Sequence, residues 1–175
     1  SGGLRGALNG PPMSVSCDPQ ILPVIRPWLD ALGGNYTHYS QIGFGHLAKG
    51  LHNSVEYCMM QGLAEGISLY FAHGFSQQQI LDTFKTWSKG SIIQSTLLDC
   101  LISCLESNDF QNAQTITRSE TVSLLKELSV AGHPTPCIDT AIHTRENPSV
   151  VDSKTQTALA LMRKNFGGHQ TSTPP

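Results

Sequence analysis

The sequence predicts an all-helical bundle built around one long central helix. Two observations carry this prediction: residues 46–71 contain no proline and place apolar side chains at helical spacing, and no segment after Ser40 has the alternation typical of a strand. The apolar positions are Leu47, Leu51, Val55, Cys58, Met59 and Leu63. Gly50 and Gly62 each cost the helix roughly 1 kcal/mol relative to alanine, so we expect something to pack closely there.

The other elements follow from local signals. Residues 1–12 are rich in glycine and proline and predict a loop, residues 13–17 predict a short strand, and a helix that starts at or after Asp18 ends at Gly33-Gly34. Ser76 and Gln79 form a capping-box pattern that opens the next helix. The remaining predictions are helices over 76–87, 91–105, 119–130, 136–145 and 148–165, a polar loop over 106–117 and a loose tail over 171–175.

Length and composition narrow the class of protein. A chain of 175 residues suits one domain, and a charged fraction of 14% is well below the roughly 25% of a typical domain, which suggests a surface covered by a partner. A net charge of −2 argues against a nucleic-acid-binding protein, and no apolar run is long enough for a membrane span. The five cysteines lack the spacing of a metal site, so we expect no metal, reduced thiols and a cytoplasmic protein.

The residues that suggest chemistry lie in the first half of the long helix. Lys49, His52, Asn53 and Glu56 are spaced i, i+3, i+4 and i+7, which places them on one face, with the apolar stripe on another side. Such a set is at least as often a solvated surface. However, the glycine-rich entry at residues 43–45 lets a ligand or another backbone approach, and the positive end of the helix dipole disfavours a charged lysine. Lys49 is therefore a candidate general base.

The run GFGHLAKGLHNSVEYCMMQ at residues 43–61 resembles the signature of 6-phosphogluconate dehydrogenases. The wider group of β-hydroxyacid dehydrogenases shares only the glycine, Lys49 and Asn53, whereas His52, Glu56 and Tyr57 are typical of the decarboxylating enzymes.

The resemblance extends over nearly the whole chain. Ser1-Gly2-Gly3, with Gly6, Ala7 and Gly10, looks like the substrate loop that closes the family's nucleotide-binding domain; residues 87–93 look like its Trp-x-x-Gly segment. Residues 134–145 resemble the helix that ends in a phosphate-binding arginine, and Arg163 with residues 166–169 resembles the C-terminal motif of the shorter members. The resemblance implies a nucleotide-binding-domain remnant at 1–39 and a helical catalytic and dimerisation domain at 40–170.

The resemblance also implies a mechanism: hydride transfer from 6-phosphogluconate to NAD or NADP, then loss of carbon dioxide to give ribulose 5-phosphate. Lys49 would act as the base and Glu56 would protonate the product. The remaining motif residues would bind the substrate: Ser1, Gly2, Gly3, His52, Asn53, Tyr57, Arg145, Arg163 and His169. Of these, Arg163 and His169 would reach across a homodimer interface into the partner's site. Arginine suits phosphate because its planar fork binds two oxygens together.

Two departures from the family pattern qualify these expectations. The dinucleotide fingerprint GxGxxG is absent from this sequence, so we expect the chain alone to be inactive and assign no cofactor-binding residues. Val122 stands where the family carries a basic residue, which predicts the loss of one phosphate contact. Two alternatives stay open: a non-catalytic dimerisation or ligand-sensing module, and a dehydrogenase of another β-hydroxyacid, against which His52 and Glu56 argue. The strand at 13–17 should lack a partner within the chain, and so be mobile or pair with another copy.

Overall fold

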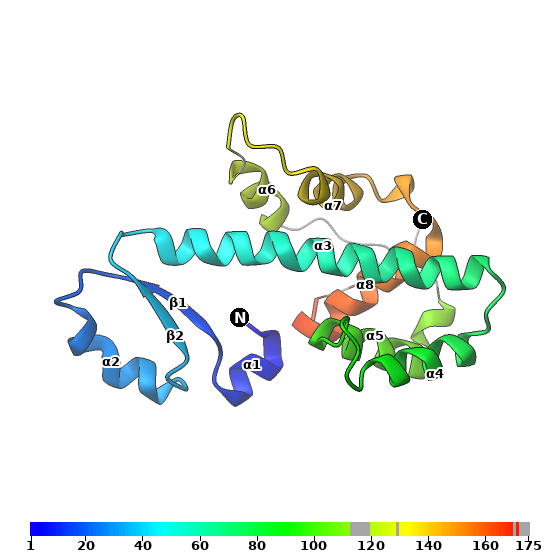
Figure 1. Cartoon of the computed structure of the whole chain (residues 1–175), viewed down its shortest axis with the longest axis horizontal. Coiled ribbons are helices and arrows are strands. Elements are labelled where there is room, and N and C mark those ends of the chain that lie inside the picture. Colours follow the sequence, from blue (N-terminus) through cyan, green and yellow to red (C-terminus); the bar gives the residue numbers. More distant parts are fainter. Residues whose placement is uncertain (113–119, 129, 170, 172–175) are drawn as a thin grey trace.

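The computed structural model describes residues 1–112, 120–128, 130–169 and 171, and its helices confirm the predicted all-helical class. A small two-stranded sheet lies beneath the N-terminal half of the central helix (Figure 1). The elements in chain order are α1 (Gly3–Asn9), β1 (Met13–Ser16), α2 (Leu22–Ala31), β2 (Tyr36–Tyr39), α3 (Phe44–Ala72), α4 (Gln77–Trp87), α5 (Thr96–Glu106), the 3-10 helix η1 (Asn108–Gln111), α6 (Glu120–Glu127), α7 (Pro136–Glu146), the 3-10 helix η2 (Pro148–Val150) and α8 (Ser153–Gly167).

The predicted long helix is α3, whose 29 residues span about 43 Å and form the spine of the molecule. Its N-cap, Gly43, has a φ of 88°, a left-handed conformation that favours glycine. A Cβ atom on Gly45 would lie 2.8 Å from the carbonyl oxygen of Ser14 in β1. The glycine-rich entry therefore accommodates the backbone of a neighbouring strand.

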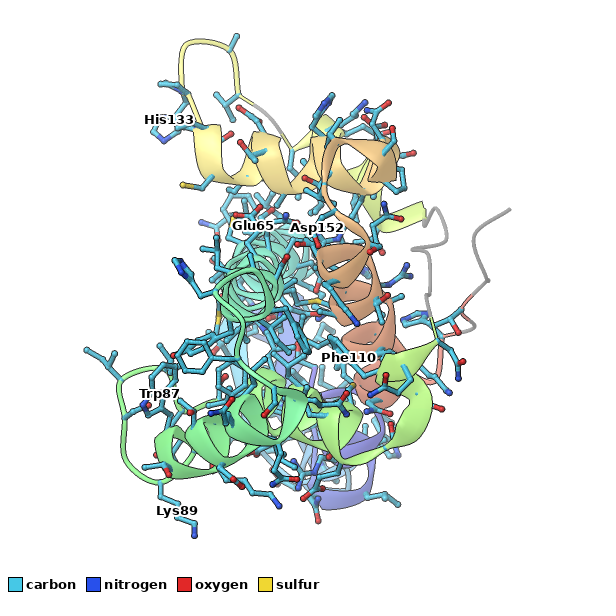
Figure 2. The ribbon with its side chains drawn as sticks, turned by 90° about the vertical axis from the view of Figure 1, so that its right-hand side faces the viewer. Glu65, Trp87, Lys89, Phe110, His133 and Asp152 are labelled. Carbon is cyan, nitrogen blue, oxygen red and sulfur yellow. The ribbon has the colours of Figure 1, made fainter. Side chains whose placement is uncertain are left out.

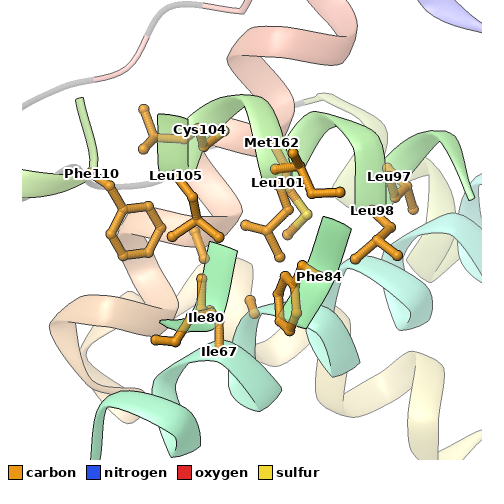
Figure 3. Packing of buried hydrophobic residues seen from close by; sticks show 14 of the residues in the cluster. Ile67, Ile80, Phe84, Leu97, Leu98, Leu101, Cys104, Leu105, Phe110 and Met162 are labelled. Atoms are coloured by element: carbon orange, nitrogen blue, oxygen red, sulfur yellow. The ribbon is translucent and has the colours of Figure 1, made fainter. Parts of the chain in front are cut away.

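The main core lies between the C-terminal half of α3 and helices α4, α5 and α8. Figure 3 shows Ile67, Phe84, Leu101 and Met162 meeting from these four helices. Ser76 caps α4 with a complete capping box to Gln79, as the sequence predicts. Because α5 alone buries seven residues, this half of the molecule is well packed.

A second, smaller core lies on the other side of α3. It joins Tyr57 of α3 to Val122 and Leu125 of α6 and to Ala141 and Ile142 of α7. His133 and Trp87 mark the two opposite sides of α3 in the end-on view (Figure 2). The predicted close packing at Gly50 is present, since a Cβ there would lie 2.5 Å from the Leu128 side chain, whereas Gly62 has nothing within 4 Å.

The N-terminal residues differ from their prediction. Residues 3–9 form α1 rather than loop, and β1 pairs in parallel with β2, from Met13 opposite Tyr36 to Ser16 opposite Tyr39. The expectation that β1 lacks a partner within the chain is therefore wrong. β2 was not predicted because its four residues gain strand geometry from this pairing, with Met13 N–H donating to the Asn35 carbonyl at its edge.

Three other segments differ in extent. The helix predicted from residue 91 begins at Thr96, because Ser95 accepts the Leu98 N–H and caps it there. The predicted loop at 106–117 contains η1, and the helix predicted over 148–165 divides into η2 and α8, where Asp152 caps the second part. Most of the predicted tail, 172–175, lies outside the described residues.

The apolar stripe of α3 faces outward. Leu47, Leu51, Val55 and Met59 are between 38% and 59% exposed, whereas the buried face carries glycine, serine, tyrosine and glutamine as well as apolar residues. Small and polar residues face the core in the first half of α3 because α6 and α7 approach closely there. None of the helices in the described part of the chain is long and apolar enough to cross a membrane.

Candidate functional site

The predicted polar face of α3 is a connected cluster. Lys49 Nζ lies 3.4 Å from His52 Nδ1, which lies 3.4 Å from Asn53 Oδ1 and 3.8 Å from Glu56 Oε2. Glu56 is the more enclosed of the last pair, with 14% of its side chain exposed against 51% for His52. About two turns of helix thus present an amine, an imidazole, an amide and a carboxylate within reach of one small ligand.

Arg145 lies directly beside this cluster, at the end of α7. Its guanidinium carbon sits 3.8 Å above the Tyr57 ring, and one of its amino groups donates to the Ala141 carbonyl at 2.9 Å. The residue is only 2% exposed, and its Nε has no hydrogen-bond partner among the described residues. Burial lowers the pKa of Arg145 to about 10, although Tyr57 and Glu56 act in the opposite sense.

A guanidinium with this pKa keeps its charge at neutral pH. A buried cation with an unsatisfied N–H is costly unless an anion comes to it. The arrangement therefore fits an oxyanion ligand, which is the chemistry expected of Arg145.

The C-terminal residues of the motif lie in the same region. Arg163 on α8 is buried, and its positive charge lowers the pKa of Arg145. Partial burial and Arg163 lower the pKa of His169, while Glu56 raises it. These groups are brought together within one chain, so the predicted contribution across a dimer interface stays a prediction.

The N-terminal residues lie next to this cluster. A Cβ on Gly3 would collide with the Phe166 carbonyl oxygen, so only glycine allows α1 to lie this close to the end of α8. Partial burial and Lys49 lower the pKa of the Ser1 amino group, and Glu56 raises it. Gly2 lines a hollow together with His52 and Glu56. The predicted Ser1-Gly2-Gly3 segment thus adjoins the polar face of α3.

Val122, where one basic residue was expected, belongs to the second core and is 2% exposed. A valine there packs against its apolar neighbours and offers no contact to an anion.

The turn after β1 does not fit a dinucleotide cofactor. A nucleotide-binding sheet holds phosphates on a glycine-rich turn between a strand and a helix. Here β1 leads to Cys17-Asp18-Pro19, which contains no glycine. The Asp18 carboxylate accepts the Gln20 N–H at 2.8 Å, so this backbone N–H already has a partner within the turn. Within the described part of the chain, no three His, Cys, Asp or Glu side chains are grouped in a way that could hold a metal.

Comparisons with known proteins identify the family. Residues 45–172 match the family described as 6-phosphogluconate dehydrogenase, C-terminal domain. The chain is 27% identical to the putative 6-phosphogluconate dehydrogenase YqeC of Bacillus subtilis, over 98% of the chain and 59% of that protein. It is 29% identical to the NAD(+)-dependent, decarboxylating 6-phosphogluconate dehydrogenase of Haloferax volcanii, over 98% and 60%.

A solved structure supports the fold alone. Psf3 in complex with NADP+ and 2-OPP superposes with a TM-score of 0.65 at 20% identity, covering 95% of this chain and 56% of that one. The chain spans about three fifths of the length of the Bacillus subtilis and Haloferax volcanii relatives.

Proposed function

Because the chain belongs to the 6-phosphogluconate dehydrogenase family, whose C-terminal domain it matches, we propose that it supplies the substrate site of a decarboxylating dehydrogenase acting on 6-phosphogluconate. The observation that carries the proposal is the buried Arg145 beside the Lys49–Glu56 cluster. This pairs an oxyanion anchor with an amine and a carboxylate that can move protons.

The proposed roles follow from position on α3. Lys49 takes the proton of the substrate hydroxyl and returns it to the carbonyl oxygen as carbon dioxide leaves. Glu56, about two turns further along, protonates the carbon left behind. His52 and Asn53 orient the sugar acid between them, because both lie within 3.4 Å of a neighbour in the cluster.

The arginines bind the phosphate group of the substrate. Arg145 and Tyr57 hold it, with Arg163 and His169 nearby. The nicotinamide of NAD or NADP would accept the hydride. Since the sequence lacks the dinucleotide fingerprint, we expect the chain alone to bind the sugar acid but not to turn it over.

Calorimetric titration with 6-phosphogluconate tests the proposal. We expect saturable binding that weakens at least tenfold in Lys49→Ala and in Arg145→Met, since each loses a charged contact. The methionine keeps the apolar bulk over Tyr57, so the fold should survive. Lys85→Ala is the matched control, because Lys85 pairs with Glu106 on the far side of the main core and should leave binding unchanged.

Two results would contradict the proposal: no binding to the parent chain, or binding that neither substitution affects. A ligand-sensing module is distinguished by Glu56→Gln. In a dehydrogenase this change spares binding but should abolish the reaction of a longer protein that carries the nucleotide-binding domain.

We also propose a homodimer formed through the outward face at the start of α3, since the exposed Phe44, Leu47 and Leu51 give it an apolar surface. Light scattering should report a dimer or a larger assembly, and Leu47→Lys should shift it toward the monomer. Leu69→Lys, beyond this stretch on the same helix, is the control. A parent chain that is monomeric at every concentration would contradict the proposal.

A further inference from the structure

A hollow of about 670 Å³ opens beside the polar face of α3, between α1, α5 and the end of α8. We call this face, which carries Lys49, His52, Asn53 and Glu56, the catalytic face. His52 and Glu56 line the hollow on the side of α3, with Val55 and Met59 as apolar neighbours. Arg5 lines it from α1 and lies near Asp99 of α5. The hollow thus shares His52 and Glu56 with the proposed site, and Arg145 is not among its lining residues.

Among the residues that line the hollow, Arg5 carries a permanent positive charge. Its pairing with Asp99 is loose: the nearest nitrogen and oxygen are 3.7 Å apart, and the two side chains are 71% and 50% exposed. Ion pairs of this kind contribute little, because both groups stay hydrated and screened. Arg5 can therefore leave Asp99 for a better-placed oxyanion at small cost.

The backbone that carries Arg5 is held in place by glycines on both sides. Gly3 lies against the Phe166 carbonyl, and a Cβ on Gly6 would collide with the Ser1 carbonyl. The first approach places α1 against the end of α8, and the second holds Ser1 against α1 itself. The long side chain of Arg5 consequently starts from a defined point at the rim of the hollow.

Arg5 and Arg145 approach α3 from different sides. Val55, which lines the hollow, and Tyr57, which Arg145 covers, are two residues apart and so about 200° apart around the helix axis. Glu56 lies midway between them. A ligand that crosses the catalytic face can therefore place one anionic group on each arginine.

We infer that Arg5 is a specificity-determining residue that binds one of the two oxyanionic ends of an acidic sugar phosphate. This inference rests on the proposed function and deepens it. The ligand is selected for carrying a second anion beside the hollow that Arg5 lines, and Arg5 adds a cationic contact, whereas Val122 in the second core offers none. Guanidinium suits either a carboxylate or a phosphate, because its fork matches both.

Binding measurements on Arg5 and Asp99 variants test the inference. We expect Arg5→Ala to weaken 6-phosphogluconate binding about tenfold and to reduce its dependence on salt. Asp99→Asn should leave binding unchanged or up to about threefold tighter, because it releases Arg5. A merely structural ion pair would instead make both substitutions act alike on thermal stability and neither on binding. Arg26→Ala, an exposed arginine on α2, is the matched control.

Two further probes identify which anion Arg5 binds. Gluconate lacks the phosphate, and glucitol 6-phosphate lacks the carboxylate. If Arg5 reads the carboxylate, Arg5→Ala weakens gluconate and spares glucitol 6-phosphate; if it reads the phosphate, the pattern is reversed. Either pattern supports the inference.

The two proposals fail differently. Unchanged 6-phosphogluconate affinity in Arg5→Ala, with affinity lost in Arg145→Met, overturns the role of Arg5 and leaves the proposed function standing. If the parent chain does not bind 6-phosphogluconate, both are overturned together.

Discussion

Helices α2 and α5 have similar lengths and similarly amphipathic sequences, yet they occupy opposite environments. α5 buries seven of its eleven residues in the main core, whereas none of the ten residues of α2 is buried. The apolar side of α2 is open to solvent at Ile21, Val24, Trp28 and Leu32. An amphipathic pattern thus predicts a helix and a face to be covered, but what covers that face is a separate question.

The same contrast separates the two regions to which these helices belong. The body from α3 to α8 has its own core, while the β1–α2–β2 unit is a two-stranded sheet with one uncovered helix. Sheets of two strands are marginal alone and need packing on another element. Here that element is the start of α3, which β1 meets at Gly45.

The largest expected effect compares the same substitution in the two regions. Leu101→Ala should lower the free energy of unfolding by about 2–5 kcal/mol, because Leu101 is fully buried and its removal leaves a cavity. Leu32→Ala, at the exposed end of α2, should change it by less than about 0.5 kcal/mol. Urea denaturation followed by circular dichroism measures both. Equal losses would mean that the α2 face is covered in solution.

A smaller effect is expected at alkaline pH, where a buried cysteine of the main core should make stability depend on pH. Burial raises the pKa of the Cys104 thiol on α5 to about 12. Between pH 9 and 12 the unfolded chain releases this proton and the folded chain keeps it, so stability falls as pH rises. We expect a loss on the order of 1–2 kcal/mol by pH 10.5.

Cys104→Ala supplies the control for this pH dependence. It should lower stability at neutral pH by removing buried volume, but flatten the decline above pH 9. A parallel decline in the variant would assign the effect to other groups. In the N-terminal unit, half-buried Cys17 should react with a thiol reagent in the folded protein far faster than Cys104 does.

Local signals predicted the elements that depend on local interactions. The capping box of Ser76 and the long uninterrupted pattern of α3 fix two helices with little help from the rest of the chain. β2 could not be predicted in this way, since its four residues become a strand through pairing with β1. The outward direction of Leu51 and Val55 was equally inaccessible, because periodicity separates two faces without saying which one meets α6 and α7.

The candidate site shows the same division. Spacing alone placed Lys49, His52, Asn53 and Glu56 on one face, and the structure brings them into contact. The stacking of Arg145 on Tyr57 joins residues on two different helices, so only the family resemblance pointed to it. Arg5 was missed, although its place two residues after Gly3 in the substrate-loop motif was a usable signal.

The smallest expected effect tests whether the α2 face is open in this chain. Trp28 is 65% exposed, so Trp28→Ser removes no buried contact and should change the free energy of unfolding by less than about 0.5 kcal/mol. The same substitution should reduce any self-association through α2, because an exposed apolar stripe of this kind is a sticky surface. Circular dichroism in urea at two protein concentrations separates these outcomes. A loss of more than about 2 kcal/mol at the higher concentration alone would show that α2 contacts another copy. The same loss at both concentrations would place Trp28 in a packed interior, and the contrast between α2 and α5 would no longer hold.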